Sequence, residues 1–522
     1  MCTNFQADLS DAGTFINTME LVPKAEPEGR SIDTVLGFAR KAQADGRISA
    51  VSITDNPGGR PSLSPDMLGK EILNCGMDVI VHFTCRDMNR LGIESRALQL
   101  RRMGMKNILA LTGDYTGKGF GGSGAPVFDI DSVLLLCQLS MLDHKAQPEK
   151  NLAPFFLGCA VSPFKWTEPE SWVQYYKLCK KISSGARFVI TQLGYDVRKF
   201  QELIQFFNTF SIKIPALASI YFLSPKSARV MNSGRVPGAV VRNPLFQKIK
   251  KEWEGDPRRG YFASVERAAK LASICKGLGY RGIHICGIHR NFRTVERILD
   301  RMAEIEHNWQ DFAEEFDSSR REDFYMFIRS PLSRLSDEKL APHIQRTSGL
   351  DKLHFKSLNA MHNLFFRFDA PFSAPYNTLC QWLDQHRWGY YLVKFMEDGL
   401  KKMLLSCRMC GDCGIQHVGF LCPESQCPKH IRNGACGGSR DGFCEVNPER
   451  HCVWYRAYRR LASVNRQGEL SVGCVPPRMW ELDGKSSWIN FHLRRDHQSV
   501  SSEITNSCSG QTCRVNLNPP EP

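Results

Sequence analysis

The stretch Asn107-Ile-Leu-Ala-Leu-Thr-Gly-Asp114 is a short apolar run that ends in Gly-Asp and leads into a glycine-rich loop over residues 116–124. A helix-like segment, 95–103, comes before it. A run of this length, closed by turn residues, is typical of a buried parallel strand. Since the carboxyl end of such a strand opens towards a binding site, we expect Asp114 to lie at the edge of a site.

Seven other segments have the same short apolar pattern, and amphipathic helical stretches separate most of them. Eight strands that alternate with helices over roughly 300 residues predict a (β/α)8 TIM barrel, whose usual length is about 250 residues. A doubly wound sheet is the alternative fold, but no Gly-x-Gly-x-x-Gly follows the first strand, which ends in Glu20-Leu-Val-Pro23. The seven further segments are 15–23, 48–54, 79–85, 155–162, 188–195, 213–222 and 282–288.

The composition is that of an ordinary globular protein. The 522 residues are 42% apolar, and no apolar run approaches the roughly 18 residues that span a bilayer. The first 13 residues lack the basic and apolar regions of a signal peptide, so we expect a cytoplasmic protein without a membrane segment. The net charge of +14 is dispersed among acidic residues, which argues against nucleic acid and favours small polyanionic ligands.

Polar and aromatic side chains stand at the predicted strand ends. Glu20 has apolar neighbours, which raise the pKa of a carboxyl group and suit it to donate a proton near neutral pH; a structural carboxylate is the alternative. Thr54 opens a donor-rich loop, and His82 is either a ligand or a satisfied core histidine. The amide of Gln192 can both donate to and accept from a heterocycle. Phe222 either stacks on a planar ring or belongs to the core.

Four of these segments match one family in order and in separation. The series Met19-Glu20-Leu-Val-Pro23, Val81-His82-Phe-Thr84-Cys85, Ala110-Leu-Thr-Gly-Asp114 and Ile190-Thr-Gln192 resembles the methylenetetrahydrofolate reductase family, over about residues 10 to 300. Four matches in register on four strands are far more specific than any one alone. The resemblance implies a barrel with a flavin across the carboxyl ends of its strands, which a reduced nicotinamide reduces and which then passes hydride to the folate methylene group.

The resemblance also implies roles for individual residues. Glu20 is similar to the general acid that opens the imidazolidine ring, and Asp114 to the carboxylate beside the flavin and pterin. Lys181 also has a plain structural interpretation, because a helix dipole favours cations at the end of a helix. The residues implied to bind folate are Gln192, Phe222 and Arg290, and those implied to bind FAD, with FMN as the alternative, are Thr54, His82, Leu111, Thr112, Gly113, Asp114, Ala160 and Lys181.

Eight cysteines within 46 residues form the densest pattern in the chain, and they can supply two complete four-cysteine sites. Three of them have Cys-x2-Cys-x2-Cys spacing, and a Cys-Pro pair follows, which favours iron-sulfur clusters. Structural zinc is the alternative, and disulfides are the least favoured reading in a cytosolic protein. The predicted metal ligands are Cys407, Cys410, Cys413, Cys422, Cys427, Cys436, Cys444 and Cys452.

The sequence around these cysteines also resembles a known module. The motifs 422–429, Cys-Pro-Glu-Ser-Gln-Cys-Pro-Lys, and 433–442, Asn-Gly-Ala-Cys-Gly-Gly-Ser-Arg-Asp-Gly, are similar to the cysteine-rich carboxyl-terminal domain of some bacterial methylenetetrahydrofolate reductases. In acetogenic bacteria a similar module occurs as a separate partner subunit. The resemblance implies that electrons reach the flavin through this module, from a ferredoxin-type carrier.

The regions predicted in this way are a flavin-binding barrel over 1–300, a charged helical linker over 301–355, a cysteine-rich metal-binding domain, α+β or mainly irregular, over 356–462, and a polar, partly disordered tail over 463–522. We expect flavin-dependent reduction of 5,10-methylenetetrahydrofolate to 5-methyltetrahydrofolate in one-carbon and methionine metabolism, or the reverse reaction. We expect NAD(P)H or a ferredoxin-type carrier as the electron donor. A homo-oligomer is compatible with the sequence. The alternative function is a non-catalytic adaptor whose cysteine module docks redox partners.

Overall fold

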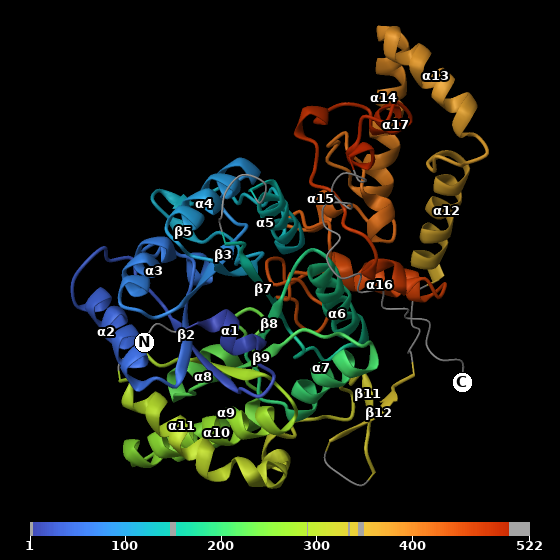
Figure 1. Ribbon diagram of the computed structural model, residues 1–522. Helices are drawn as coiled ribbons and strands as arrows, with labels where there is room; N and C mark the ends of the chain where they lie inside the picture. The colour runs from blue at the N-terminus through green and yellow to red at the C-terminus, as the bar shows by residue number, and fades with distance from the viewer. Residues whose placement is uncertain (1–3, 147–152, 290, 332–334, 343–348, 501–522) are drawn as a thin grey trace.

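Eight parallel strands close into a barrel in the order β1-β10-β9-β8-β7-β4-β3-β2 (Figure 1). The computed structural model describes residues 4–146, 153–289, 291–331, 335–342 and 349–500. The TIM-barrel prediction is confirmed, and each of the eight predicted segments contains one strand of the barrel. The strands are β1 (Ile16–Leu21), β2 (Ile48–Ile53), β3 (Val79–Thr84), β4 (Asn107–Leu111), β7 (Phe156–Val161), β8 (Phe188–Thr191), β9 (Ala216–Tyr221) and β10 (Gly282–Cys286).

Helices connect these strands around the outside of the barrel, because parallel neighbours need a crossover connection. Two further helices, α8 (Pro225–Asn232) and α9 (Asn243–Trp253), extend the connection after β9, and a short hairpin of β5 (Lys118–Gly119) and β6 (Gly122–Ser123) follows β4. The crossover helices are α2 (Arg30–Asp45), α3 (Pro65–Asn74), α4 (Arg90–Arg102), α5 (Ser132–Ala146), α6 (Glu168–Ser183), α7 (Val197–Thr209) and α10 (Pro257–Gly277), and α11 (Arg293–Ile305) follows the last strand.

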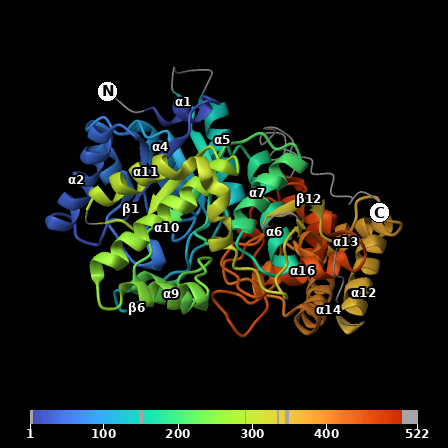
Figure 2. The same ribbon diagram turned by 90° about the horizontal axis from the view of Figure 1, so that it is seen from below.

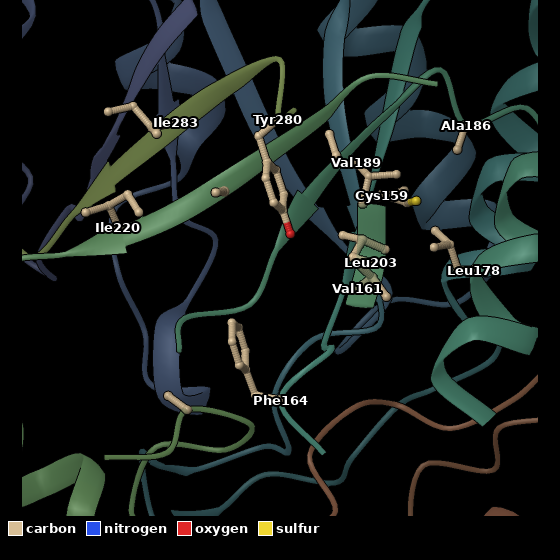
Figure 3. Packing of buried hydrophobic residues seen from close by; sticks show 14 of the residues in the cluster. Cys159, Val161, Phe164, Leu178, Ala186, Val189, Leu203, Ile220, Tyr280 and Ile283 are labelled. Atoms are coloured by element: carbon tan, nitrogen blue, oxygen red, sulfur yellow. The ribbon is translucent and has the colours of Figure 1, made fainter. Parts of the chain in front are cut away.

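The larger core lies between the barrel and its outer helices. Figure 3 shows part of it, including Val161 of β7 and Leu178 of α6, which belong to one buried cluster. Because helices cover the outer face and side chains fill the inner face, β3 is buried at all of its positions. This double burial explains why the strands read as continuous apolar runs without alternation.

The short helix α1 (Phe5–Ser10) closes the amino-terminal mouth of the barrel. The side chain of Phe5 is fully buried, and its ring centroid lies 5.8 Å from that of Phe156 and 5.2 Å from that of Phe188. Its backbone N–H donates to Asp78 Oδ2 at 2.9 Å. Gly158 leaves space for the Phe188 ring, because a Cβ at this position would lie 2.2 Å from the ring. We therefore expect a site at the carboxyl-terminal mouth of the barrel.

The segment predicted as a charged helical linker, 301–355, is only partly helical. Its first helical part ends with η2 (Glu306–Phe316), the chain then forms an antiparallel hairpin of β11 (Phe327–Arg329) and β12 (Ser336–Leu340), and α12 begins at Gly349. Buried Arg198 of α7 donates through Nε to Ser336 Oγ at 3.0 Å. Polar contacts with the barrel therefore stabilise the hairpin, and the charge pattern of the linker could not indicate them.

The cysteine-rich region is mainly helical, with irregular loops that carry the cysteines. Figures 1 and 2 show its long helices projecting from one side of the barrel. The cysteine loops lie between these helices and α16, and include only short helical turns. The helices are α12 (Gly349–Phe365), α13 (Ser373–Gln385), α14 (Arg387–Leu405) and α16 (Val453–Ala462), and the turns are η3 (Ile415–Val418) and α15 (Pro423–Gln426).

The region predicted as a partly disordered tail is folded as far as residue 500. It contains η4 (Gln467–Ser471), η5 (Trp480–Leu482), α17 (Ser487–His492) and η6 (His497–Ser499). Glu397 of α14 accepts hydrogen bonds from Ser486 Oγ at 2.6 Å and from Ser487 N at 3.1 Å. A polar sequence therefore folds here because a buried carboxylate satisfies its donors.

Residues 501–522, the rest of the predicted tail, lie outside the described residues. Within the described ranges, no helix combines the length and the apolar character that crossing a membrane requires.

Replacing Phe5 by alanine should lower the free energy of unfolding of the barrel by about 3–5 kcal/mol, since the change removes a fully buried ring and leaves a cavity. Chemical denaturation, followed by circular dichroism, measures the loss. The matched control is Phe120→Ala, because Phe120 is fully exposed in the β5–β6 hairpin and its loss should leave stability unchanged. If the two variants were equally stable, the conclusion that α1 stabilises the barrel by closing its amino-terminal mouth would be wrong.

Candidate active site

The parallel barrel brings the ends of distant segments to one mouth. Glu20 is the penultimate residue of β1, Asp114 follows β4 by three positions, Gln192 directly follows β8, and Phe222 directly follows β9. Because all eight strands run in the same direction, their carboxyl ends meet at this mouth. Residues predicted from separate motifs therefore share one site.

Burial makes Glu20 a proton donor near neutral pH. Loss of solvent around its carboxyl group raises the pKa of Glu20 to about 7, as its apolar neighbours predict, while the nearby thiol of Cys286 opposes the shift. Strand pairing explains that contact, since Met19 pairs with Ile285 and so aligns the next residue of each strand. The result is a carboxylic acid that can keep its proton until a substrate needs it.

His284 lies beside this acid and does not act as a free base. The ligand atoms of Glu20, His284 and Cys286 all lie within 4.8 Å of one another. However, the ring nitrogens of His284 contact Thr18 Oγ1 at 2.8 Å and Ser52 Oγ at 3.3 Å. Burial lowers its pKa to about 3, so the ring is neutral. Both nitrogens already have protein partners, which disfavours a metal at this cluster.

Asp114 is held by backbone geometry at the start of the loop after β4. Its Oδ2 accepts a hydrogen bond from Gly58 N at 2.7 Å. The preceding residue, Gly113, has a φ of 90°, and a Cβ there would lie 2.8 Å from Arg86 Cγ. Glycine is therefore required at this turn. The turn places the Asp114 carboxyl group just beyond the carboxyl end of β4.

Several buried polar atoms around the mouth lack a partner among the described residues. They are Thr54 Oγ1, His82 Nε2, Ser162 Oγ and Gln174 Nε2. Burial lowers the pKa of His82 to about 4, so its ring is neutral and can either donate or accept at Nε2. Buried polar groups are nearly always hydrogen-bonded, so these atoms fit a polar ligand such as the amide-rich edge of a flavin.

Lys181 and Ala160 are in direct contact. The ammonium group of Lys181, in the last turn of α6, donates to the backbone carbonyl of Ala160 at 2.6 Å, and burial lowers its pKa to about 8. Thr112 is less available, since its hydroxyl donates to Ser132 Oγ at 3.2 Å. Leu111, the last residue of β4, is partly buried at the same mouth.

The predicted folate residues have different environments. The Oε1 atom of Gln192 accepts from Leu193 N at 2.8 Å, and its Nε2 lies near Gly238, where an added Cβ would be 3.1 Å away. Phe222 is partly buried, and its ring centroid lies 5.8 Å from that of Tyr261. Arg290 lies outside the described residues, so its predicted role stays a prediction.

The eight clustered cysteines separate into two groups of four. The first group, Cys407, Cys410, Cys413 and Cys422, lines one cavity below α14. In the second group Cys427 lies beside Cys436, Cys444 and Cys452. Loops fold back on themselves to make this arrangement, as Cys452 N donates to Gly442 O at 2.8 Å.

The electrostatics of the two groups suit a bound cation. Burial, with neighbouring charges, raises the pKa of Cys410 in the first group and of Cys436 in the second to about 12, whereas a hydrogen bond with Cys407 lowers the pKa of Cys422 to about 6. The raised thiols do not ionise near neutral pH unless a positive ion compensates the charge, and metal binding does this. Each group could therefore hold a metal ion or cluster.

A third cluster is better explained as an ion-pair network. The ligand atoms of Asp412, Asp496 and His497 lie within 4.8 Å of one another. Yet Asp412 accepts from Arg432 at 2.9 Å and contacts His497 Nδ1 at 2.5 Å, and both partners are buried. Its charge is already balanced, so this cluster stabilises the loop that carries the first cysteine group.

Two residues at the mouth were not singled out by sequence reasoning. Cys286 contacts Glu20, and the signal that could have identified it is its place at the end of the strand that closes the barrel against β1. Lys429, from the cysteine-rich region, donates to Gly113 O at 2.8 Å. It follows a Cys-Pro pair, but no pattern in the sequence indicates a contact across more than 300 positions.

Solved structures resemble this chain only loosely. An uncharacterized protein from Clostridium thermocellum that binds two copies of 5-methyl-5,6,7,8-tetrahydrofolic acid has a TM-score of 0.39 and 14% identity, over 58% of this chain and 98% of that one. The crystal structure of 2,3-dimethylmalate lyase has a TM-score of 0.33 and 12% identity, over 59% of this chain and 88% of that one. Likenesses at this level do not bear on function.

Sequence relatives are more informative. Probable methylenetetrahydrofolate reductase (NADPH) of Caenorhabditis elegans is 28% identical over 149 residues, which are 28% of this chain and 20% of that protein. Methylenetetrahydrofolate reductase 1 of Schizosaccharomyces pombe is 24% identical over 270 residues, which are 50% of this chain and 42% of that protein. The chain therefore spans less than half the length of each of these relatives.

Family models cover both halves of the chain. The model described as methylenetetrahydrofolate reductase matches residues 7–303, and the model described as methylene-tetrahydrofolate reductase C terminal matches residues 391–481. The first match includes the whole barrel, and the second includes all eight clustered cysteines. Since the first model alone covers more than half of the 522 residues, the chain belongs to the methylenetetrahydrofolate reductase family.

Proposed function

We propose that the protein reduces 5,10-methylenetetrahydrofolate to 5-methyltetrahydrofolate with a bound flavin, or catalyses the reverse reaction. The observation that carries this proposal is the pair of carboxyl groups at one barrel mouth. Glu20 is a half-buried acid whose pKa is raised to about 7 by desolvation, whereas Asp114 is held by a backbone N–H at the start of a loop. Two carboxyl groups in such different surroundings can divide acid and electrostatic roles.

The chemistry of the folate explains why both are needed. The methylene carbon is bonded to two nitrogens, and it resists hydride until one nitrogen is protonated and its C–N bond opens. Glu20 would donate that proton, and the carboxylate of Asp114 would stabilise the positive charge that develops on the iminium intermediate. A bound flavin would supply the hydride that the carbon accepts.

The unpartnered atoms at the mouth support a flavin. Thr54 Oγ1 and His82 Nε2 are buried, and neither has a hydrogen-bond partner in the described part of the chain. We assign these two residues, with Ala160 and Lys181, to the flavin, together with the turn from Leu111 through Thr112 and Gly113 to Asp114. FAD is the preferred form and FMN the alternative. We assign Gln192, Phe222 and Arg290 to the folate.

We prefer iron-sulfur clusters to zinc for the two cysteine groups, because Cys407, Cys410 and Cys413 have the Cys-x2-Cys-x2-Cys spacing of cluster ligands. Structural zinc is the alternative. A cluster would suit electron delivery to the barrel from a ferredoxin-type carrier. The NADPH named for the Caenorhabditis elegans relative keeps a nicotinamide donor as the alternative.

The alternative of a non-catalytic adaptor is less well supported. An adaptor needs the cysteine module and a stable barrel, but it does not need a desolvated acid at the barrel mouth. Desolvation disfavours the charged form of Glu20, so this group lowers stability as the pH rises above its ordinary pKa, and the loss is complete above the raised pKa of about 7. The chain has Glu20 in spite of this loss of stability, and it also has Asp114 and Gln192 at the same mouth. This combination favours an enzyme.

Replacing Glu20 by glutamine should lower the rate of the folate half-reaction by about 10²–10⁴-fold, because the variant has no acid proton to donate. Reduction of the flavin by the electron donor should survive. Stopped-flow absorbance measures the two half-reactions separately. Glu26→Gln is the matched control, because Glu26 is exposed in the loop after β1 and should not affect either rate. Equal loss of both half-reactions in the Glu20 variant would refute the assigned role.

The folate half-reaction should depend on pH in one direction. Glu20 has a pKa of about 7, so it is protonated below that pH and loses its proton above it. The rate of methylenetetrahydrofolate reduction should therefore be flat below pH 7 and fall about tenfold per pH unit above it. Single-turnover rates across a pH series test this. A rate that rises with pH would contradict an acid role for Glu20.

The metal content tests the cysteine assignment. Anaerobically purified protein should contain iron and acid-labile sulfide, and Cys410→Ala should lose one of two clusters, about half of the iron, since it removes one ligand of the first group. Cys75→Ala is the control, because Cys75 follows α3 in the barrel and belongs to neither cysteine group. Stoichiometric zinc without iron would overturn the iron-sulfur assignment and favour a nicotinamide as the direct reductant.

A further inference from the structure

The cysteine-rich region reaches over the barrel mouth and is fixed there by buried cations of the barrel. Lys165, which follows β7, donates through Nζ to Gly437 O at 2.7 Å and also to the carbonyl of Ser439. Lys177 of α6 donates to Gly434 O at 3.1 Å. Because ammonium groups on backbone carbonyls give charge-assisted hydrogen bonds, the loop 433–439 is firmly placed on the barrel.

This loop lies next to a predicted folate residue. A Cβ added to Gly238 would lie 3.1 Å from Gln192 Nε2 and 3.2 Å from Gly437 O. The amide of Gln192 and the carbonyl of Gly437 therefore approach the same glycine from opposite sides of the boundary between barrel and module. The module borders the site and does not simply pack on the outside of the barrel.

Lys429 of the module extends furthest into the mouth. Its side chain is buried, and its Nζ donates to Gly113 O at 2.8 Å and to Glu445 Oε1 at 2.5 Å. The negative charge of Asp114 is close enough to act on this ammonium group. A buried cation thus contacts the glycine turn that presents Asp114.

The same cation also connects the mouth to the second cysteine group. The Oε1 atom of Glu445, which accepts from Lys429, lies 3.2 Å from Cys436 Sγ. A continuous series of contacts therefore runs from Cys436 through Glu445 and Lys429 to the turn at Gly113. The first cysteine group lines a separate cavity beneath α14 and has no part in this series.

We propose that Lys429 is a positioning residue of the barrel site, supplied by the cysteine module, and that its charge raises the reduction potential of the flavin assigned to that site. This inference rests on the proposed function. A fixed cation at a water-poor mouth stabilises a ring that gains negative charge on reduction. Its hydrogen bond to Gly113 O also fixes the turn that carries Asp114.

The test uses the complete chain with its bound cofactors, in three variants. Lys429→Met removes the cation, Lys429→Arg keeps it, and Glu445→Gln removes the neighbouring negative charge. Lys356→Met is the control, because Lys356 is an exposed lysine on α12 of the same module. The midpoint potential of the flavin is measured by anaerobic titration against reference dyes, and flavin, iron, sulfide and zinc are quantified in each sample.

The two charge changes should shift the flavin potential in opposite directions. Lys429→Met should make it more negative than in the wild type, and Glu445→Gln should make it more positive. Lys429→Arg and Lys356→Met should keep the wild-type value. If the role of these residues were purely structural, Lys429→Met and Glu445→Gln would shift the flavin potential in the same direction or would only reduce the cofactor content. Either result would overturn the inference.

The outcome for the wild type distinguishes this inference from the function on which it rests. A wild-type chain that holds no flavin would overturn both. A wild-type chain that holds flavin and reduces methylenetetrahydrofolate, with a Lys429→Met variant of unchanged potential and cofactor content, would overturn the role of Lys429 alone.

Discussion

Closure of the parallel sheet is the constraint on which the site depends. β1 pairs with β2 on one side and with β10 on the other, so the first and last strands of the barrel are neighbours. That pairing places Cys286 against Glu20 and gathers all eight carboxyl ends at one mouth. α1 fills the opposite mouth with Phe5. The predicted site residues therefore gather at the end of the barrel opposite to α1.

Burial then determines the charge state of the groups at that end. The same loss of solvent raises the pKa of Glu20 and lowers those of His82, His284 and Lys181. Each of these groups is pushed towards its neutral form. Asp114 has a different setting, because its Oδ2 accepts a hydrogen bond from Gly58 N and the ammonium group of Lys429 is nearby. The mouth thus combines a desolvated acid with a carboxyl group that is hydrogen-bonded to the backbone.

The boundary between the barrel and the cysteine module is made by cations that cross it in both directions. Lys165 and Lys177 of the barrel donate to carbonyls of the module, and Lys429 of the module donates to a carbonyl of the barrel. Burying an ammonium group without a partner costs free energy, so separating the two parts would be unfavourable. These contacts therefore fix the position of the module on the barrel. The second cysteine group is therefore held close to the mouth.

The sequence by itself determined the barrel, because short apolar runs and turn residues are local signals, and it determined the candidate residues Glu20, Asp114 and Gln192 and the eight cysteines through motifs in register. It did not indicate the β11–β12 hairpin or the folded segment up to residue 500, because contacts with Arg198 and Glu397 stabilise these polar stretches. Nor could it pair Cys286 with Glu20 or Lys429 with Gly113. Tertiary structure decided these contacts, because they depend on barrel closure and on docking of residues more than 250 positions apart.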